Sequence, residues 1–400
     1  MNILFLSTEN PYPPVGGHHI RTYNVLRILS ERYRIFFVGF AQNREELGYV
    51  ENLKELCETV DVYLIPKTGL NPRFLYQASR NLLSALPLTA ERFFIPEARD
   101  KIRQHLKIHR IDVVHVDMLA LARYEECLQG VPAILTNHNV ESLRLYRWMK
   151  TEGNFIKKSY LYYQYLKLRA FEKKMCPLFR HCIVVSNDDK RHLMNLCDAN
   201  NFVVVPNGVD VDYFKPLDEE TRRNHLIWVG GMSGPYNSDA VDFFLDRIWP
   251  LVKRDIPEAT VDFIGKSPTR KLTEKAQADP SINVLGFIDD VRPYVQRASV
   301  FVAPIRSGSG TKIKVLNAMA QARPVVATTV AAEGIEVTDG QNILLADDPV
   351  QFAGKIILLL KDEETARRIG LNARVLIESK YSWDIISETI FQIYQEFQRK

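Results

Sequence analysis

The segment Pro304–Thr329 reads PIRSGSGTKIKVLNAMAQARPVVATT and contains the pattern that decides the fold. An apolar run over 298–304 predicts a buried strand, which ends in the glycine loop 307–310. Apolar residues at helical spacing follow, and the run 324–327 predicts a second strand. A strand, a short loop, a helix and another strand in this order indicate a parallel α/β unit.

The glycine loop of this segment is typical of an anion site. Glycines let backbone N–H groups approach a ligand closely, and the N-terminus of a helix carries partial positive charge. Lys312 and Lys314 add formal charge in the first turn, so a diphosphate would be bound well there. A plain strand–helix connection would use the same glycines only for its turn, and the local pattern does not separate the two interpretations.

The composition is that of a globular protein. The chain has 400 residues, of which 46% are hydrophobic and 25% charged, which predicts two or three domains. The sequence contains no apolar run of the ~20 residues that a spanning helix needs, and its five scattered cysteines form no CxxC pair. We therefore expect a cytoplasmic protein without structural zinc.

Positive charge is concentrated in residues 143–181. This segment holds ten Lys or Arg and two Glu, about +8 against +4 for the whole chain, and tyrosines are interleaved with the basic residues. One interpretation is a solvated helix face whose tyrosines pack inward. The other is contact with an anionic membrane surface or an anionic acceptor. No RNA- or DNA-reading motif is present, so no nucleic-acid partner is expected.

Strand and helix patterns alternate along the chain and restart after the turn Pro206-Asn207-Gly208. We predict two doubly wound domains that face an interdomain cleft, with residues 1–205 in the first and 206–379 in the second. Ligands bind at the carboxyl ends of the strands in such sheets.

Short motifs recur in a fixed order over nearly the whole chain, and together they resemble a GT-B glycosyltransferase. The likeness is to the large family four of retaining, nucleotide-sugar-dependent enzymes, and within it to bacterial cell-surface polysaccharide sugar transferases. Its motifs are Pro14-Val-Gly16-Gly17 with Arg21, Asp112-Val-Val-His-Val116, His138-Asn-Val-Glu-Ser142, Val184-Val-Ser186, Val205-Pro-Asn-Gly-Val-Asp210, Gly286-Phe-Ile-Asp-Asp-Val291, the opening segment, Glu333-Gly-Ile335, Gly340-Gln-Asn342 and Tyr381-Ser-Trp383.

The resemblance implies two Rossmann-like domains and metal-independent sugar transfer with retention, with no cofactor. The donor would be a nucleotide-diphosphate sugar, with UDP, GDP and dTDP types left open. The acceptor would be a glycan or a lipid-linked molecule, bound by the N-terminal domain at the inner face of the membrane. The C-terminal domain would bind the donor, and a final helix over 380–400 would cross back to the first domain. A degenerate GT-B subunit that binds nucleotide without turnover is the alternative.

The resemblance also implies roles for individual residues. Gly16, Gly17 and His138 would be catalytic, and Arg21, Asn139 and Glu141 would lie on the acceptor side; no metal ligand is expected. The donor-binding residues would be Gly230, Gly231, Lys266, Arg306, Gly308, Ser309, Gly310, Thr311, Lys312 and Asn317.

The chain departs from the family pattern at four positions. Ser309 and Asn317 stand where the family commonly has two glutamates, and Gly231 and Asn237 stand where many relatives have Arg and Lys. A neutral amide at 317 would weaken donor binding by about 1 kcal/mol, or about fivefold. Phosphate charge must then be met elsewhere, and Lys312, Arg306 and Lys266 are the residues that we nominate, together with the backbone amides of 310–312.

Overall fold

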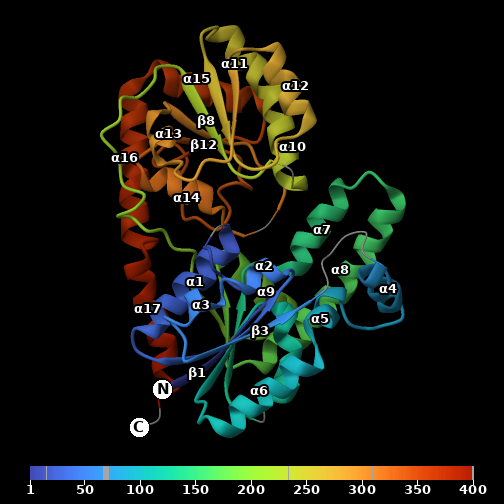
Figure 1. Ribbon diagram of the computed structural model, residues 1–400. Coiled ribbons are helices and arrows are strands. Elements are labelled where there is room, and N and C mark those ends of the chain that lie inside the picture. The colour runs from blue at the N-terminus through green and yellow to red at the C-terminus, as the bar shows by residue number, and fades with distance from the viewer. Residues whose placement is uncertain (15, 66–71, 129, 233, 309, 399–400) are drawn as a thin grey trace. The chain divides into compact units, whose positions relative to one another are not determined.

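The computed structural model describes residues 1–400 except 15, 66–71, 129, 233, 309 and 399–400. The chain divides into two compact units (Figure 1). Unit 1 contains residues 1–206 and 387–400, and unit 2 contains residues 207–386. The boundary expected after residue 205 lies one residue from this division, whereas the return to unit 1 comes at 387, later than the expected 380.

Unit 1 is built on a seven-stranded parallel sheet with the order β3-β2-β1-β4-β5-β6-β7. The strands are β1 (Asn2–Ser7), β2 (Arg34–Ala41), β3 (Thr59–Leu64), β4 (Val113–Asp117), β5 (Ala133–Asn137), β6 (His181–Val184) and β7 (Phe202–Val204). The central strands of this sheet are largely apolar and buried, because helices cover a parallel sheet on both faces.

The strand order puts a topological switch point between β1 and β4. Strands β2 and β3 extend the sheet on one side of β1, and β4 to β7 extend it on the other. Ser7 of β1 pairs in register with Asp117 of β4, and Asp117 pairs with Thr136 of β5. The carboxyl ends of these strands therefore lie side by side, where doubly wound sheets bind ligands.

Helices flank this sheet (Figure 1). They are α1 (Gly17–Ser30), α2 (Arg44–Leu47), α3 (Val50–Leu53), α4 (Pro72–Asn81), α5 (Leu88–Phe93), α6 (Pro96–Ile108), the 3-10 helix η1 (Leu119–Cys127), α7 (Glu141–Thr151), α8 (Phe155–Met175), the 3-10 helix η2 (Cys176–Leu178) and α9 (Asn187–Cys197).

The basic segment forms the helix pair α7 and α8, and part of it is structural. Lys167 is buried, and its Nζ donates to the backbone carbonyl of Asn81 at 2.6 Å. The hydroxyl of Tyr163 donates to the carbonyl of Leu82 at 2.7 Å. These contacts tie α8 to the end of α4, and they agree with the interpretation in which one face of the segment packs inward.

Unit 2 contains a six-stranded parallel sheet with the order β10-β9-β8-β11-β12-β13. The strands are β8 (His225–Val229), β9 (Thr260–Ile264), β10 (Ile282–Gly286), β11 (Val300–Ala303), β12 (Val325–Ala327) and β13 (Leu344–Leu345). The helices are α10 (Pro235–Phe243), α11 (Trp249–Asp255), α12 (Arg270–Ala278), α13 (Arg292–Arg297), α14 (Ile313–Ala320), α15 (Pro349–Lys361) and α16 (Glu363–Lys380).

The helical segment between β8 and β9 is interrupted in the structure. A π-helical turn, η3 (Phe244–Ile248), separates α10 from α11. Pro250 stands in the first turn of α11 and has no N–H group for an α-helical hydrogen bond to the preceding turn. The chain widens to a π turn just before it, so α10 and α11 do not form one continuous α-helix.

The last helix, α17 (Trp383–Gln395), begins in unit 2 and continues into unit 1. Within unit 1, the hydroxyl of Tyr394 forms a hydrogen bond with Nδ1 of His115, and the Tyr394 ring stacks near Tyr33. The C-terminal part of the helix is thus anchored under the central strand β4.

Candidate functional site

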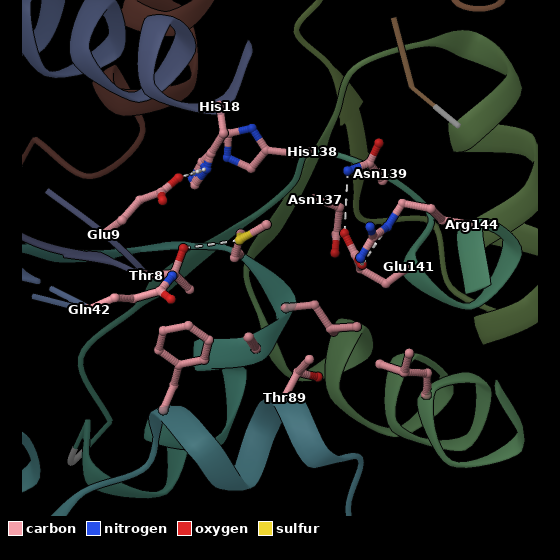
Figure 2. A pocket seen from close by; sticks show the side chains of 15 residues that line it. Thr8, Glu9, His18, Gln42, Thr89, Asn137, His138, Asn139, Glu141 and Arg144 are labelled. Atoms are coloured by element: carbon pink, nitrogen blue, oxygen red, sulfur yellow. Dashed lines mark hydrogen bonds and ion pairs between the residues drawn. The ribbon is translucent and has the colours of Figure 1, made fainter. Parts of the chain in front are cut away.

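A pocket of about 240 Å³ opens at the carboxyl ends of β1, β4 and β5 in unit 1 (Figure 2). Its floor is largely apolar and its rim is polar and charged, as expected of a site that orients a small molecule. The lining residues are Thr8, Glu9, His18, Gln42, Thr89, Phe93, Met118, Leu119, Ala120, Asn137, His138, Asn139, Glu141, Arg144 and Leu168.

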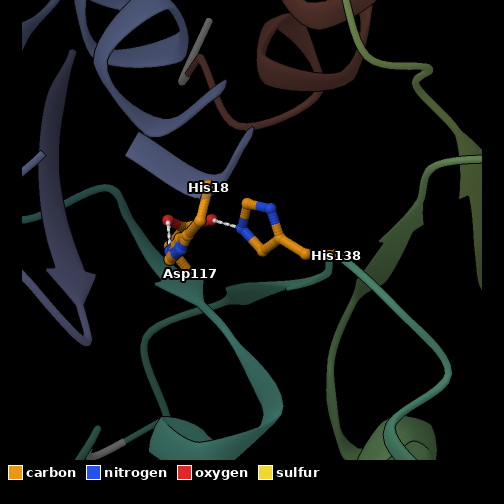
Figure 3. A group of neighbouring side chains, drawn as sticks. All are labelled: His18, Asp117 and His138. Carbon is orange, nitrogen blue, oxygen red and sulfur yellow. Dashed lines mark hydrogen bonds and ion pairs between the residues drawn. The ribbon is translucent and has the colours of Figure 1, made fainter. Parts of the chain in front are cut away.

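His138, the predicted catalytic histidine, is held beside this pocket by a buried carboxylate. Its Nε2 lies 2.7 Å from Oδ1 of Asp117 (Figure 3). The other oxygen, Oδ2, accepts a 2.6 Å hydrogen bond from Thr22. The His18 ring lies against His138, tilted by 33° and with 4.4 Å between centroids, and its Nε2 lies 3.8 Å from Asp117 Oδ2. Three side chains from α1, β4 and the end of β5 thus converge.

The charge of Asp117 is maintained although the residue is buried. Burial alone would raise its pKa, but His138 and His115 outweigh that effect and hold the pKa of Asp117 well below its usual range. Burial and the neighbouring His138 lower the pKa of His18 to about 4 against the attraction of Asp117 and Glu9. At neutral pH the pair Asp117–His138 therefore presents a carboxylate, and His18 is a neutral ring.

Glu9 is a second carboxylate at the rim. It lies 3.1 Å from Nδ1 of His18 and 3.1 Å from Nε2 of His19. Burial would raise the pKa of Glu9, but the hydrogen bond to His19 and the electrostatic influence of the two neighbouring imidazoles lower it overall. An alternating chain of acid and base therefore runs from Glu9 through His18 to Asp117 and His138.

The same cluster has the chemistry of a cation site. His18, Asp117 and His138 each offer a ligand atom, and these atoms lie within 4.8 Å of one another. Both Asp117 oxygens already accept hydrogen bonds from protein groups, so the cluster is also satisfied as a hydrogen-bonded unit.

Two of the three predicted acceptor-side residues line the pocket. Asn139 donates to Glu141 at 3.3 Å, and Glu141 in turn forms a 2.6 Å ion pair with Arg144 (Figure 2). Arg21, the third, is not among the residues that line this pocket. Its guanidinium is buried and donates to the carbonyls of Val205 and Pro206, because the carbonyls at the end of unit 1 need donors there.

Gly16 and Gly17 lie at the N-terminus of α1, directly before His18. Gly16 adopts φ +100°, a conformation that glycine tolerates and other residues rarely adopt. Both glycines are exposed, and the carbonyl of Gly16 accepts the first helical bond from Ile20. Their backbone is thus presented at the same edge as the pocket.

In unit 2 the glycine loop follows β11 and leads into α14, as predicted. Gly308 and Gly310 adopt φ +115° and +71°, and Lys312 occupies the N-cap position of the helix. Ser309 lies outside the described residues. Thr311 carries a buried hydroxyl with no hydrogen-bond partner among the described residues, and Asn317 lies partly buried on the helix.

Two of the three nominated phosphate cations are engaged elsewhere. Arg306 forms a 2.6 Å ion pair with Asp239, which neutralises its charge. Lys266 lies over the ring of Phe287, 4.4 Å from its centroid. Lys312 donates to the carbonyl of Gly310 at 2.5 Å, within the loop itself. Gly230 and Gly231 follow β8 as expected.

Asp117, His18 and Glu9 belong to the site but were not predicted from the sequence. The signal for Asp117 was present, because a polar residue ends the apolar run 113–117 at the carboxyl end of a strand. His18 and Glu9 carried no comparable signal, since their contacts depend on how α1 and the loop before it fold back over β4.

Comparison with known proteins places both units in one family. A family model described as Glycosyltransferase Family 4 matches residues 15–213, and one described as Glycosyl transferases group 1 matches residues 223–362. A putative glycosyltransferase of Bacillus subtilis, EpsD, is 31% identical over 365 residues, which cover 80% of this chain and 90% of that protein. The chain belongs to the glycosyltransferases.

Other relatives match this glycosyltransferase at lower identity. An uncharacterized 44.6 kDa protein in the cps region of Klebsiella pneumoniae is 22% identical, and the match covers 98% of this chain and 99% of that protein. The phosphatidyl-myo-inositol mannosyltransferase of Mycolicibacterium smegmatis is 28% identical over 223 residues, 53% of this chain and 56% of that one.

Solved structures confirm the expected GT-B fold for this glycosyltransferase. Sucrose-phosphate synthase from Thermosynechococcus elongatus superposes with a TM-score of 0.72 at 16% identity, covering 99% of both chains. HepE from Anabaena, in complex with UDP, superposes with a TM-score of 0.69 at 14% identity, covering 99% of this chain and all of that one. At these identities the likeness concerns the fold.

Proposed function

We propose that this glycosyltransferase moves a sugar from a nucleotide-diphosphate donor to a glycan or lipid-linked acceptor, with retention and without a bound metal ion. The observation that carries the proposal is the buried Asp117–His138 pair, 2.7 Å apart at the rim of the unit 1 pocket. We place the reaction in cell-surface polysaccharide synthesis, and the relative in a cps region supports that assignment.

Unit 2 would hold the donor nucleotide. The loop through Gly308 and Gly310 brings backbone N–H groups to the start of α14, which suits a diphosphate. HepE, of the same fold, is described in complexes with UDP and with UDP-glucose, which supports a donor of this class.

The bond changes follow from retention. The bond between the anomeric carbon and the diphosphate oxygen breaks, and the acceptor hydroxyl forms its new bond on the same face. The departing diphosphate takes the proton of that hydroxyl, so charge and protons balance without another base. Negative charge then grows on the diphosphate, where amides and lysine side chains stabilise it electrostatically.

Unit 1 would act on the sugar and the acceptor. His138 would contact the donor sugar, and Asp117 would hold its ring and favour positive charge near it. Asn139 and Glu141, at the far rim of the same pocket, would bind acceptor hydroxyls, because amides and carboxylates suit that task.

We expect pure protein to release nucleoside diphosphate from one class among UDP-, GDP-, ADP- and dTDP-sugars, and to transfer the sugar when a suitable glycan or polyprenyl-linked acceptor is added. NMR of the product should show the anomeric configuration of the donor. Activity should persist in EDTA, because the phosphate charge is met by protein groups.

Three outcomes would contradict parts of this proposal. Loss of activity in EDTA that zinc or magnesium restores would assign a cation to the cluster of His18, Asp117 and His138. Inversion at the anomeric carbon would exclude retention. Nucleotide binding without turnover of any donor would favour a degenerate binding subunit.

We also propose that unit 1 contacts an anionic membrane through the start of α8 and the end of α4. Leu83, Phe155 and Ile156 are 93%, 81% and 80% exposed, although such side chains normally avoid water. Lys157 and Lys158 follow directly. Apolar side chains beside lysines suit the interface of an anionic bilayer. No helix that the structure describes has the length and apolarity to span a membrane.

Replacing Phe155 and Ile156 together by serine should weaken binding to vesicles that contain an anionic phospholipid by about tenfold or more, because the inserted apolar area is lost. Sedimentation with vesicles of phosphatidylglycerol and phosphatidylcholine measures this. Val350→Ser, which removes a 67% exposed apolar residue from unit 2, is the control and should bind like the wild type. Equal binding by all three proteins would reject the contact.

A further inference from the structure

Lys314 lies at the topological switch point of unit 2. Strands β8 and β11 are neighbours in the sheet, and the chain extends to β9 and β10 on one side and to β12 and β13 on the other. Lys314 stands in the first turn of α14, and its Nζ lies 4.2 Å from the centroid of the Trp228 ring on β8. The ammonium group therefore lies near the carboxyl end of β8, where such sheets take their ligands.

The backbone at the end of β8 is shaped around this side chain. Gly230 adopts φ +148°, and a Cβ atom built on it would lie 2.3 Å from Nζ of Lys314. Any larger residue at 230 would displace the ammonium group. The glycine and the lysine thus form one arrangement, although they are far apart in the sequence.

Lys314 keeps its hydrogen-bonding capacity for a ligand. Its Nζ donates to Oδ1 of Asn237 at 3.2 Å, which is a neutral partner. Among the described residues no carboxylate forms an ion pair with it, in contrast to Arg306 with Asp239. Burial, and next the charge of Lys312, lower the pKa of Lys314 to about 7. Burial and a neighbouring positive charge disfavour the protonated form of Lys314, so an anion that binds beside it would stabilise that form.

A second group in the same loop lacks a partner. The hydroxyl of Thr311 is buried, and no hydrogen-bond partner for it is found in the described part of the chain. Buried hydroxyls are normally satisfied, so this one points to a ligand with acceptor oxygens.

We propose that Lys314 and Thr311 bind the phosphate groups of the donor, with Lys314 as the principal cation. This inference rests on the proposed function, because it assumes a nucleotide-diphosphate ligand in unit 2. Lys314 thus takes the role of phosphate-binding cation that the sequence had suggested for Arg306 and Lys266. The inference also accounts for Gly231 after β8 and Asn237 on α10, which stand where many relatives have Arg and Lys: here the cation comes from α14 and donates to Asn237.

Lys314→Met should weaken the binding of the preferred nucleoside diphosphate by about 10- to 100-fold, because a charge-assisted contact to phosphate is lost. Binding of the corresponding nucleoside, which has no phosphate, should not change. Calorimetric titration of both ligands measures this, and Lys312→Met, which removes the neighbouring lysine, should have the smaller effect.

The affinity of the wild type should also depend on pH. Lys314 is largely neutral above pH 7 and must take up a proton when the diphosphate binds, so affinity should fall by up to about tenfold per pH unit between about pH 7 and pH 9. Among the charged groups around it, Lys312 adds to the lowering of the pKa of Lys314, and Asp239 is paired with Arg306. Lys314→Met should remove the dependence.

Asn237→Asp provides a test that does not depend on the fold of the methionine variant. A carboxylate at 237 would pair with Lys314 and compete with the diphosphate, so this variant should also lose affinity about tenfold or more. Unchanged diphosphate binding in either folded variant would overturn the inference. If the wild type bound no nucleoside diphosphate at all, the proposed function itself would fail.

Discussion

Replacing Asp117 by asparagine is expected to lower kcat about 30-fold while the dissociation constant of the donor nucleotide stays within about twofold of the wild type. Asparagine still offers an oxygen to His138 but no charge. A charge-assisted hydrogen bond is worth about 1–2 kcal/mol more than a neutral one, which corresponds to about 5- to 30-fold in rate when the difference is felt in the transition state. We take the upper end because Asp117 is buried and balances several imidazoles.

The experiment must separate a role through His138 from a general loss of structure. His138→Ala should lower kcat by about 100-fold or more, and the double variant should be no slower than His138→Ala alone, because Asp117 acts through that ring. Thr22→Val removes a donor to the same carboxylate but leaves its charge, and it should cost no more than about threefold in kcat.

Additive effects of Asp117→Asn and His138→Ala would show that the carboxylate does not work through His138. Equal losses in kcat and in thermal stability for Asp117→Asn and Thr22→Val would assign Asp117 a purely structural role.

Replacing Gly265 by alanine is expected to destabilise the protein by about 3 kcal/mol or more and to weaken nucleotide binding by more than about tenfold. Gly265 directly follows β9 with φ +155°, and a Cβ atom there would lie 1.9 Å from the carbonyl oxygen of Gly230. The clashing atom belongs to the backbone and cannot move aside by a side-chain rotation. The ends of β8 and β9 must therefore separate to make room for the Cβ atom. That movement shifts Gly230, against which Lys314 rests.

Gly231→Ala is the matched control for this prediction. Gly231 follows β8, directly after Gly230, but a Cβ atom built on it would meet nothing within 4 Å. Urea denaturation should find the free energy of unfolding of this variant within about 0.5 kcal/mol of the wild type. Equal stability of the two alanine variants would mean that the strand ends are not packed as described.

Much of the fold could be predicted because its signals are local. The run 298–304, the glycines that follow it and the helical spacing after Lys312 each depend only on neighbouring residues, and β11, its loop and α14 lie where they were expected. His138 was also predictable, since a motif places it directly after a strand. The π turn was not predicted, because the effect of Pro250 on the preceding turn does not change the spacing of apolar residues along the sequence.

The sequence by itself determined that two parallel α/β units follow one another and that glycine loops and His138 stand at the ends of their strands. Only the tertiary structure decided which charges serve the site. It buried Arg21 against Val205 and Pro206, paired Arg306 with Asp239, and set Asp117 beside His138 and Lys314 beside Trp228. The reason is physical: strand and helix patterns follow from neighbouring residues, whereas the state of a charge depends on partners and burial that chain segments far apart supply.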